Sequence, residues 1–415
     1  MKKNTAFLFF LFIFLLCPIA VTAQYSDKES NFLVISDIHL DQASTHVMDI
    51  SPLKADRNND LDYPSFEKLI LDVENNIKNG VVAQPKFILI LGDIAGHMRY
   101  SQQSASENEA IVFRVLKDTF PDIPIFYTFG NNDSPKTNYG PFTDSSRGEY
   151  NSPYEIAKYA GGWSDGFLSV GTMCAVSKAE HYPCIITENT ISGYYSAYIE
   201  SHLQLISINS VLFSPSRKTT KQEAAEQLQW LDKQLERAKN NHEKALIIMH
   251  IPPGNNIQDH SGFWLGEEQT AFLKTVNQYQ QTVIGLLASH THAEELKIIK
   301  DRSQNNIAGV YLVAGLSTSH GNEPSVKTFY LSQENEQWQL SNYEAFHFSA
   351  EGSNLIFSKL YDYNSYYCNG EVNKLLQCLN NVTPERMDKY LAAGNRNYTG
   401  GVIRSPKDII LAAAE

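Results

Sequence analysis

The chain has 415 residues, a formal net charge of −12 and 42% hydrophobic residues, which suits one large globular domain with an appendage, or two domains. The acidic balance disfavours binding to a nucleic-acid polymer, because polymer phosphate attracts basic surfaces. A pocket that contains metal ions would still attract a small phosphorylated ligand.

The first residues follow the order of a secretory signal peptide. Two lysines precede an apolar run over residues 6–16, and small residues come before Gln24. We therefore predict a signal peptide over residues 1–23 and a secreted or periplasmic mature protein. The apolar run is too short and too early for a membrane span, and no later segment approaches about 20 consecutive apolar residues, so we expect no transmembrane segment in the mature chain.

Four further cysteines stand at positions 174, 184, 368 and 378. An even number in a chain marked for export predicts two disulfides. Of the three possible pairings we favour Cys174 with Cys184 and Cys368 with Cys378, because each bond would clamp a segment without strong helix or strand periodicity. Four buried free thiols are the alternative, which export disfavours.

Strand and helix patterns alternate along the first part of the mature chain. In chain order they predict a strand over 31–36, an amphipathic helix over 65–78, a strand over 86–91, a helix over about 106–118 and a strand over 123–129. This alternation indicates parallel strands in an α/β layered domain. Ligands of such sheets sit at the carboxyl ends of the strands.

A segment over residues 134–171, rich in Tyr, Gly, Ser and Pro, interrupts this pattern. It is either a roof over a site or a surface loop held together by its aromatic residues. The elements predicted after it are a hairpin over 193–211, a helix over 221–239, a strand over 245–249, a helix over 267–278, a strand over 282–288 and closing strands at 310–314, 328–332 and 338–343. We therefore predict one domain over residues 24–350 and a small helical C-terminal region over 351–415 that contains a disulfide.

Polar residues follow five of the predicted strands at the points where those strands end. These residues are Asp37, His39, Asp93, Asn131, His250, His290 and His292. Two divalent ions that share a bridging carboxylate need about seven carboxylate, amide and imidazole ligands from rigid positions. One such cluster alone is more often a core or capping feature, but five clusters at strand ends predict a two-metal site.

The spacing also suggests how the ligands divide between two ions. Asp37 and His39 lie two residues apart, so both side chains face one side of an extended segment. We expect one ion to be held by Asp37, His39 and His292, the other by Asn131, His250 and His290, and both by Asp93. Two ions roughly 4 Å apart can deprotonate a bridging water and polarise phosphoryl oxygens. Mixed nitrogen and oxygen ligands suit Zn, Mn or Fe rather than Ca or Mg, and we favour Zn.

The five clusters together resemble the calcineurin-like metallophosphoesterases, whose pattern runs Asp-x-His, Gly-Asp, Gly-Asn-His-Asp/Glu, His and Gly-His-x-His. In this chain the blocks read Asp37-Ile38-His39, Gly92-Asp93, Gly130-Asn131-Asn132-Asp133, His250 and His290-Thr291-His292. The resemblance implies a four-layered β-sandwich flanked by helices, with a dinuclear centre at the strand ends. It also implies hydrolysis of phosphodiesters such as sphingomyelin, or of phosphoanhydrides and esters of nucleotides.

Within that superfamily the chain is similar to the acid sphingomyelinase-like phosphodiesterases. Three features carry this likeness: His97 four residues after Asp93, His250 leading into Pro252-Pro253-Gly254, and Asn322-Glu323-Pro324-Ser325 before a strand. The sphingomyelinase proper has an additional saposin-like domain that helps to extract lipid. Asp37 follows the predicted signal peptide too closely to leave room for one, which favours small soluble substrates.

The chain departs from the family pattern at two positions. Ser289 stands where the family usually has Gly, and Asn132 stands where it usually has His. The missing histidine resembles a transition-state stabiliser or proton donor, a role commonly worth about 100 to 10,000-fold in rate. Asn132 can donate a hydrogen bond to a phosphoryl oxygen but cannot transfer a proton. His97 is therefore our main candidate for protonating the leaving oxygen, and a histidine that only supports the site is the alternative.

We expect an exported, monomeric, dinuclear-metal phosphodiesterase. It would cleave phosphodiester or phosphoanhydride bonds of small substrates, such as nucleotides or CDP-choline-like molecules, by attack of metal-activated hydroxide on phosphorus. Sphingomyelin, bound through its phospholipid headgroup, is the alternative substrate. A scaffold that binds phosphorylated ligands without turnover is a further alternative, motivated by Asn132.

Overall fold

The computed structural model describes residues 29–42, 60–97, 100–142, 150–163, 173–174, 183–257, 259–318, 322–351, 354–370, 375–387 and 410–413. The predicted signal peptide, residues 1–23, lies outside the described residues. Among the helices that are described, none combines the length and the apolar character needed to cross a membrane.

One sheet of the described chain has six strands, in the order β13-β12-β11-β1-β2-β3. Its strands are β1 (Glu29–Ile35), β2 (Phe87–Ile90), β3 (Ile125–Tyr127), β11 (Ser325–Glu334), β12 (Gln337–Glu351) and β13 (Asn354–Asp362). β1 runs parallel to β2, which runs parallel to β3, whereas β11 pairs with β1 in the antiparallel sense. The carboxyl ends of β1, β2 and β3 therefore meet at one edge of this sheet.

The second sheet has eight described strands, in the order β14-β9-β10-β8-β7-β6-β5-β4. They are β4 (Cys184–Asn189), β5 (Tyr194–Glu200), β6 (Leu203–Ser207), β7 (Lys244–Ile248), β8 (Val283–Ala288), β9 (Leu296–Lys300), β10 (Asn306–Leu312) and β14 (Ile410–Ala412). β6, β7, β8 and β10 run parallel to their neighbours in this group. The predicted hairpin is formed by β5 and β6, which pair in the antiparallel sense.

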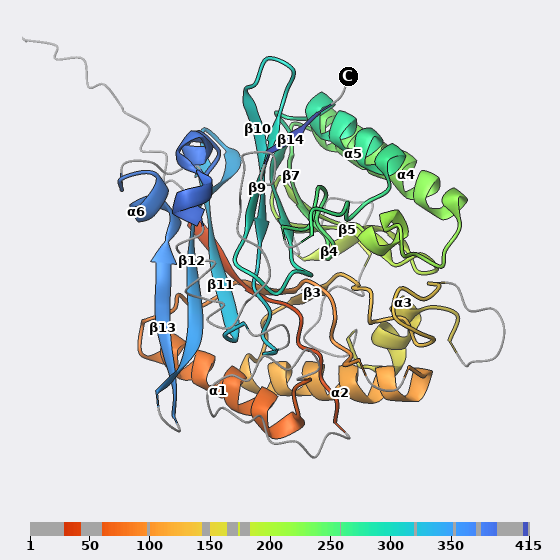
Figure 1. Cartoon of the computed structure of the whole chain (residues 1–415), viewed down its shortest axis with the longest axis vertical. Coiled ribbons are helices and arrows are strands. Elements are labelled where there is room, and N and C mark those ends of the chain that lie inside the picture. The colour runs from red at the N-terminus through yellow and green to blue at the C-terminus, as the bar shows by residue number, and fades with distance from the viewer. Residues whose placement is uncertain are drawn as a thin grey trace, which may run out of the picture.

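Helices lie on both sides of the paired sheets (Figure 1). The long ones are α1 (Tyr63–Lys78), α2 (Gln102–Thr119), α4 (Lys221–Asn240) and α5 (Gly266–Gln278), and the short ones are α3 (Pro153–Glu155), the π-helix η1 (Ile156–Ala160), the 3₁₀ helix η3 (Ser210–Phe213), α6 (Tyr363–Tyr367) and the 3₁₀ helix η5 (Leu375–Asn381). α1 and α2 cover one side, and α4 and α5 cover the other. The arrangement confirms the predicted α/β sandwich flanked by helices.

Helix α1 illustrates how the sequence specifies these layers. Asp62 caps its first turn by accepting a hydrogen bond from the Ser65 backbone N–H, which satisfies one of the helix's free donors. Its buried side chains are Phe66, Leu69, Ile70, Val73 and Ile77. Because these positions recur every three or four residues, they form one apolar face that packs on the sheet.

Aromatic contacts hold the two sheets in register with each other. The buried Tyr195 hydroxyl of β5 lies 3.1 Å from the Tyr127 carbonyl of β3 and 3.2 Å from its N–H. Tyr311 of β10 packs edge-on against Phe329 of β11 at 6.2 Å between ring centroids. Such aromatic pairs add about 0.5–1.5 kcal/mol beyond the area they bury. The sheets are thereby fixed with the carboxyl ends of β1–β3 facing those of β7 and β8.

The C-terminal region is less helical than we predicted. It does contain α6 and η5, but β13 adds a strand to the edge of the six-stranded sheet, and β14 adds one beside β9. The sequence of β13 mixes polar and apolar residues because an edge strand is partly exposed, so its pattern is weak. The domain boundary near residue 350 stays a prediction.

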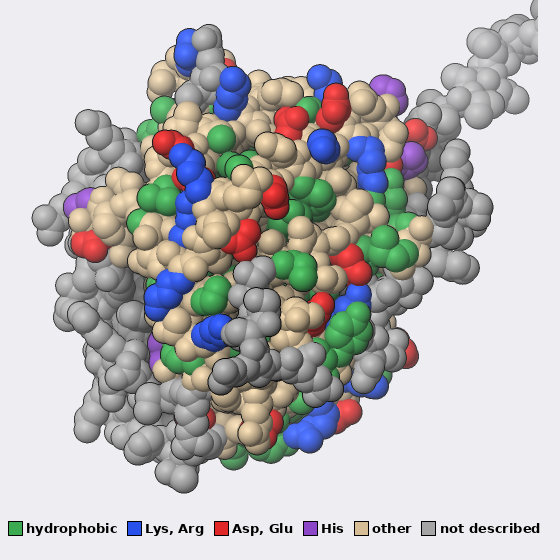
Figure 2. All heavy atoms as spheres, turned by 90° about the vertical axis from the view of Figure 1, so that its right-hand side faces the viewer, with side chains coloured by type: hydrophobic (Ala, Val, Ile, Leu, Met, Phe, Trp, Pro, Cys, Tyr) green, Lys and Arg blue, Asp and Glu red, His purple; other side chains and the backbone are tan. Residues whose placement is uncertain are grey.

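The favoured local disulfides are both formed. Cys174 bonds to Cys184 at the start of β4, and Cys368 at the end of α6 bonds to Cys378 in η5, with Cα–Cα distances of 5.0 and 5.4 Å. The second bond clips the short C-terminal helices together. On the face drawn in Figure 2, basic and acidic side chains are interspersed rather than separated.

Candidate metal centre

The structure brings the seven sequence-predicted metal ligands to one place between the two sheets. Asp37 and His39 follow β1, Asp93 follows β2 and Asn131 follows β3, all in the six-stranded sheet. His250 follows β7, and His290 and His292 follow β8, in the eight-stranded sheet. Each residue therefore lies in the loop at the carboxyl end of its strand, where open α/β sheets bind ligands.

Five of these residues have an uncommon backbone conformation. Their φ angles are positive: Asp37 at 47°, His39 at 45°, Asp93 at 54°, His290 at 74° and His292 at 57°. Residues other than glycine rarely adopt this left-handed region, and it persists where the surrounding structure enforces it. The strained turns aim the side chains across the gap between the sheets.

The first group of potential ligands contains Asp37, His39 and His292. The Nε2 atoms of the two histidines lie 3.1 Å apart. Asp37 Oδ1 lies 3.4 Å from His292 Nε2 and 4.0 Å from His39 Nε2. Ligand atoms about 2.0–2.2 Å from a zinc ion are separated from one another by similar distances.

The second group contains Asp93, His250 and His290, with Asn131 beside them. His250 Nε2 lies 3.1 Å from Asn131 Oδ1 and 3.3 Å from His290 Nδ1. Asp93 Oδ2 lies 3.3 Å from His250 Nε2 and 3.6 Å from His39 Nε2. The Asp93 carboxylate thus touches a ring nitrogen of each group.

Burial makes this arrangement unfavourable without cations. Burial raises the pKa of Asp37 to about 7, with a contribution from Asp93, and burial lowers the pKa of His39 to about 4. For His250, burial lowers the pKa, but the neighbouring Asp93 and Asp37 outweigh it and raise the pKa to about 9. Asp37 Oδ1 accepts no hydrogen bond from any described residue, although it is fully buried. An unpaired carboxylate oxygen among imidazole nitrogens fits divalent metal ions.

The Leu91 carbonyl fixes His250 from behind. It lies 2.6 Å from His250 Nδ1 and accepts a hydrogen bond from Ser289 Oγ at 2.8 Å. Since Nδ1 is engaged there, Nε2 is left to face the cluster. Gly92 makes the close approach possible, because a Cβ at that position would lie 2.6 Å from His250 Nδ1. Ser289, where the family has Gly, is therefore accommodated by a hydrogen bond.

Asp133 anchors the loops that carry Asp93 and Asn131. Its Oδ2 accepts hydrogen bonds from the backbone N–H of Asp93 at 2.8 Å and of Gly130 at 2.6 Å. Its Oδ1 accepts from Ile94 at 2.9 Å and from Ala95 at 3.3 Å. We did not assign Asp133 a role from the sequence, although it ends the Gly-Asn block. One carboxylate thus satisfies four backbone donors at the ends of two strands.

Asn132 points at Asp93 rather than into open space. Its Nδ2 donates to Asp93 Oδ2 at 2.9 Å, and its backbone N–H donates to Asp93 Oδ1 at 2.8 Å. Its Oδ1 accepts a hydrogen bond from the Tyr100 hydroxyl at 2.6 Å. The amide is buried and has a partner on each side, so it holds the Asp93 carboxylate in place.

His97 lies at the edge of the cluster and is paired with a residue that we did not predict. Its ring stacks on His39 with 4.4 Å between centroids. Asp60 lies 2.7 Å from His97 Nδ1 and accepts a second hydrogen bond, also 2.7 Å long, from the His97 backbone N–H. Burial lowers the pKa of His97, but the hydrogen bond and charge of Asp60 outweigh it and raise the pKa. Asp60 falls in a segment without a recognisable motif.

The aromatic segment over 134–171 is described only in part, so our two alternatives for it stay open as a whole. Within the described part, Tyr139 places its hydroxyl 3.3 Å from His290 Nε2. Trp163 is instead buried against Tyr127 and donates to the Ile125 carbonyl. One end of the segment therefore reaches the cluster, and the other packs in the core.

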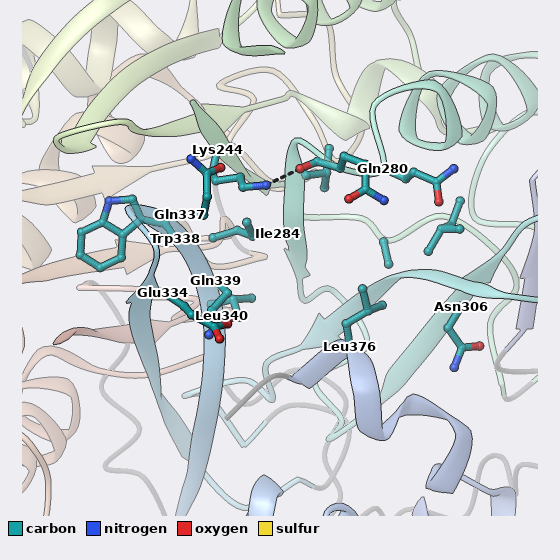
Figure 3. A pocket seen from close by; sticks show the side chains of 14 residues that line it. Lys244, Gln280, Ile284, Asn306, Glu334, Gln337, Trp338, Gln339, Leu340 and Leu376 are labelled. Atoms are coloured by element: carbon teal, nitrogen blue, oxygen red, sulfur yellow. Dashed lines mark hydrogen bonds between the residues drawn. The ribbon is translucent and has the colours of Figure 1, made fainter. Parts of the chain in front are cut away.

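A separate cavity of about 320 Å³ lies far from the cluster (Figure 3). Its lining includes Lys244, Val283 and Asn306, the first residues of β7, β8 and β10. It is therefore at the amino ends of these strands, and it shares no lining residue with the candidate metal ligands. Figure 3 shows Lys244 in a hydrogen bond with the neighbouring Gln281 carbonyl.

The chain matches a family model described as calcineurin-like phosphoesterase over residues 30–294. The chain belongs to that family. The matched range contains all seven candidate ligands together with His97 and Asn132. Membership confirms the family that the motifs indicated and makes the chain a metal-dependent phosphoesterase.

Relatives with known names lie in the acid sphingomyelinase-like branch, as predicted. A sphingomyelinase phosphodiesterase D of Dictyostelium discoideum is 26% identical over 86% of this chain and 84% of its own length. An acid sphingomyelinase-like phosphodiesterase 3b of Homo sapiens is 22% identical over 59% of this chain and 53% of its own length. A cyclic GMP-AMP phosphodiesterase of Rattus norvegicus is 24% identical over 63% of this chain and 57% of its own length. The chain therefore spans little more than half of the last two proteins.

The role of Asp133 can be tested with Asp133→Asn. An amide offers one acceptor oxygen, so two of the four backbone N–H groups would lose their partner. We expect the free energy of unfolding to fall by about 1–3 kcal/mol for each donor left unpaired, together with a lower content of bound metal. Denaturant unfolding measures the first effect, and Asp118→Asn on the exposed face of α2 is the control. Equal stability of the two variants would contradict the anchoring role.

Proposed function

We propose that the chain is a dinuclear phosphodiesterase that hydrolyses small soluble substrates. The observation that carries this proposal is the Asp93 carboxylate, which touches one ring nitrogen of each ligand group. A carboxylate in that position suits a bridge between two ions. The family supports phosphoester hydrolysis.

In this proposal Asp37, His39 and His292 hold one ion, Asn131, His250 and His290 hold the other, and Asp93 contacts both. Zn is favoured, with Mn or Fe as alternatives, because the ligands mix nitrogen and oxygen. When bound, two such ions supply Lewis acidity and lower the pKa of a water molecule held between them.

The remaining residues position groups and transfer a proton. Asn132 keeps the Asp93 carboxylate oriented through its two hydrogen bonds. Asp60 engages His97 Nδ1, which leaves His97 Nε2 to donate a proton to the leaving oxygen. His97 thereby supplies the proton that Asn132 cannot.

The substrate class remains the least constrained part of the proposal. The names of the relatives include both sphingomyelin and cyclic GMP-AMP as substrates, and these have a phosphodiester bond in common. We favour nucleotides or CDP-choline-like molecules because we see no saposin-like segment in the sequence. Sphingomyelin stays the alternative.

A scaffold without turnover is the second candidate function. Asn132 motivates it, because the usual histidine is missing. The proximity of His97 to His39 and its pairing with Asp60 argue against it, since a binding scaffold has no need of an oriented proton donor.

The first test of the proposal is metal-dependent turnover. Protein loaded with Zn or Mn should hydrolyse bis(p-nitrophenyl) phosphate, and chelation should abolish the activity. Asp93→Ala should lose both turnover and at least one bound ion, whereas Asp118→Ala should keep both. Protein that binds fewer than one ion and turns over no substrate with any divalent metal would favour the scaffold instead.

The role of His97 can be tested through the leaving group. His97→Gln should lower kcat by about 100 to 10,000-fold for a phosphodiester with an alkyl alcohol leaving group, which needs a proton. The loss should be far smaller for a p-nitrophenolate leaving group, which departs as an anion. Asp60→Asn should show the same pattern more weakly, and His260→Gln, at an exposed position, should show neither. Equal losses on both substrates would mean that His97 only supports the site.

The substrate class can be tested by direct competition. We expect kcat/KM for ATP, a cyclic dinucleotide or CDP-choline to exceed that for sphingomyelin in detergent micelles. Activity on sphingomyelin micelles alone would contradict our preference while leaving the metal chemistry intact.

A further inference from the structure

Two adjacent residues, Asn138 and Tyr139, contact the candidate ligands of only one ion position. They belong to the part of the aromatic segment that lies against the cluster. We propose that they act as a clamp that positions Asn131 and His290, and that this clamp selectively strengthens binding of the ion that those two ligands share. The inference rests on the ligand assignment proposed above.

The clamp reaches Asn131 through both residues. Asn131 Nδ2 donates a hydrogen bond to Asn138 Oδ1 at 2.8 Å. The Tyr139 backbone N–H donates to the Asn131 carbonyl at 2.8 Å. Because the amide nitrogen is engaged by Asn138, the side-chain oxygen of Asn131 is directed the other way, towards His250 Nε2 at 3.1 Å. The two bonds thus decide which atom of the Asn131 amide faces the ion position.

The clamp reaches His290 through the Tyr139 hydroxyl. His290 Nδ1 lies on the cluster side, 3.3 Å from His250 Nε2, and the Tyr139 hydroxyl lies 3.3 Å from the other ring nitrogen, Nε2. The two rings are nearly perpendicular, with an interplanar angle of 85°. A partner at the outer nitrogen fixes the tautomer and the orientation of a ligating histidine. Tyr139 therefore sets Nδ1 of His290 as the ligand atom.

The backbone of the clamp is itself held in a strained conformation. Tyr139 has a φ of 54°, and its carbonyl accepts a hydrogen bond from the Lys218 N–H at 3.1 Å. Strain of this kind is retained where the surroundings impose it and is concentrated at functional sites. The first ligand group has no printed contact with either clamp residue, so the clamp should discriminate between the two ions.

Equilibrium dialysis against buffers of graded free Zn²⁺ tests this inference. Wild-type protein should bind two ions per chain. Tyr139→Phe and Asn138→Ala should keep one ion at unchanged affinity and bind the other about 10 to 100-fold more weakly. Asn138→Asp retains an acceptor oxygen and should restore much of the loss. Tyr63→Phe, which removes a hydroxyl that donates to Glu67 on α1, is the matched control.

Loading with Mn²⁺ gives a second readout that does not depend on activity. The electron paramagnetic resonance spectrum should change from a coupled pair in the wild type to an isolated ion in Tyr139→Phe at limiting metal. Variants that bind both ions like the wild type, or lose both equally, would overturn the clamp. A wild-type protein that binds no metal would instead overturn the proposed function, so the two failures are distinguishable.

Discussion

The structure depends on the removal of two carboxylates, Asp37 and Asp93, from water into a cluster of imidazole rings. Both are buried, and Asp37 Oδ1 has no hydrogen-bond donor among the described residues. Burying an uncompensated charge of this kind costs far more than a folded protein can tolerate, so such a group either takes up a proton or finds a cation. The raised pKa of Asp37 is the protonated solution, and two divalent ions are the functional one. The fold supplies the rigid positions from which the remaining ligands reach the same ions.

Rigidity is necessary because the ligand loops are strained. Five candidate ligands have positive φ angles, and strain of about 1–3 kcal/mol for each would approach the entire free energy of unfolding of an ordinary domain, about 5–15 kcal/mol. Hydrogen bonds around the cluster offset part of this strain. Asp133 satisfies four backbone donors, and the Leu91 carbonyl ties the loops of the two sheets together. Bound ions would supply the remaining stabilisation, which couples metal binding to folding.

The sequence was sufficient for the features that depend on local patterns. The apolar runs before Asp37, Asp93 and His250 identified strands, and the polar residues after them identified the edge at which ligands meet. The sequence was not sufficient for contacts between distant segments. Asp60 pairs with His97 across 37 positions of chain, and nothing in its local pattern marks it. β13 and β14 were missed for a related reason, because short or partly exposed edge strands lack the periodicity that identifies buried ones. Asn132 shows a third limit: the sequence revealed the substitution, but only the structure shows that its amide holds Asp93.

The central claim is that the two ligand groups hold two ions that share the Asp93 carboxylate. Anomalous diffraction from crystals grown with Mn²⁺ tests it most directly. The account predicts two anomalous peaks roughly 3.5–4 Å apart, one among Asp37, His39 and His292 and the other among Asn131, His250 and His290, with Asp93 between them. A single peak, two peaks without Asp93 between them, or peaks only outside the cluster would contradict it.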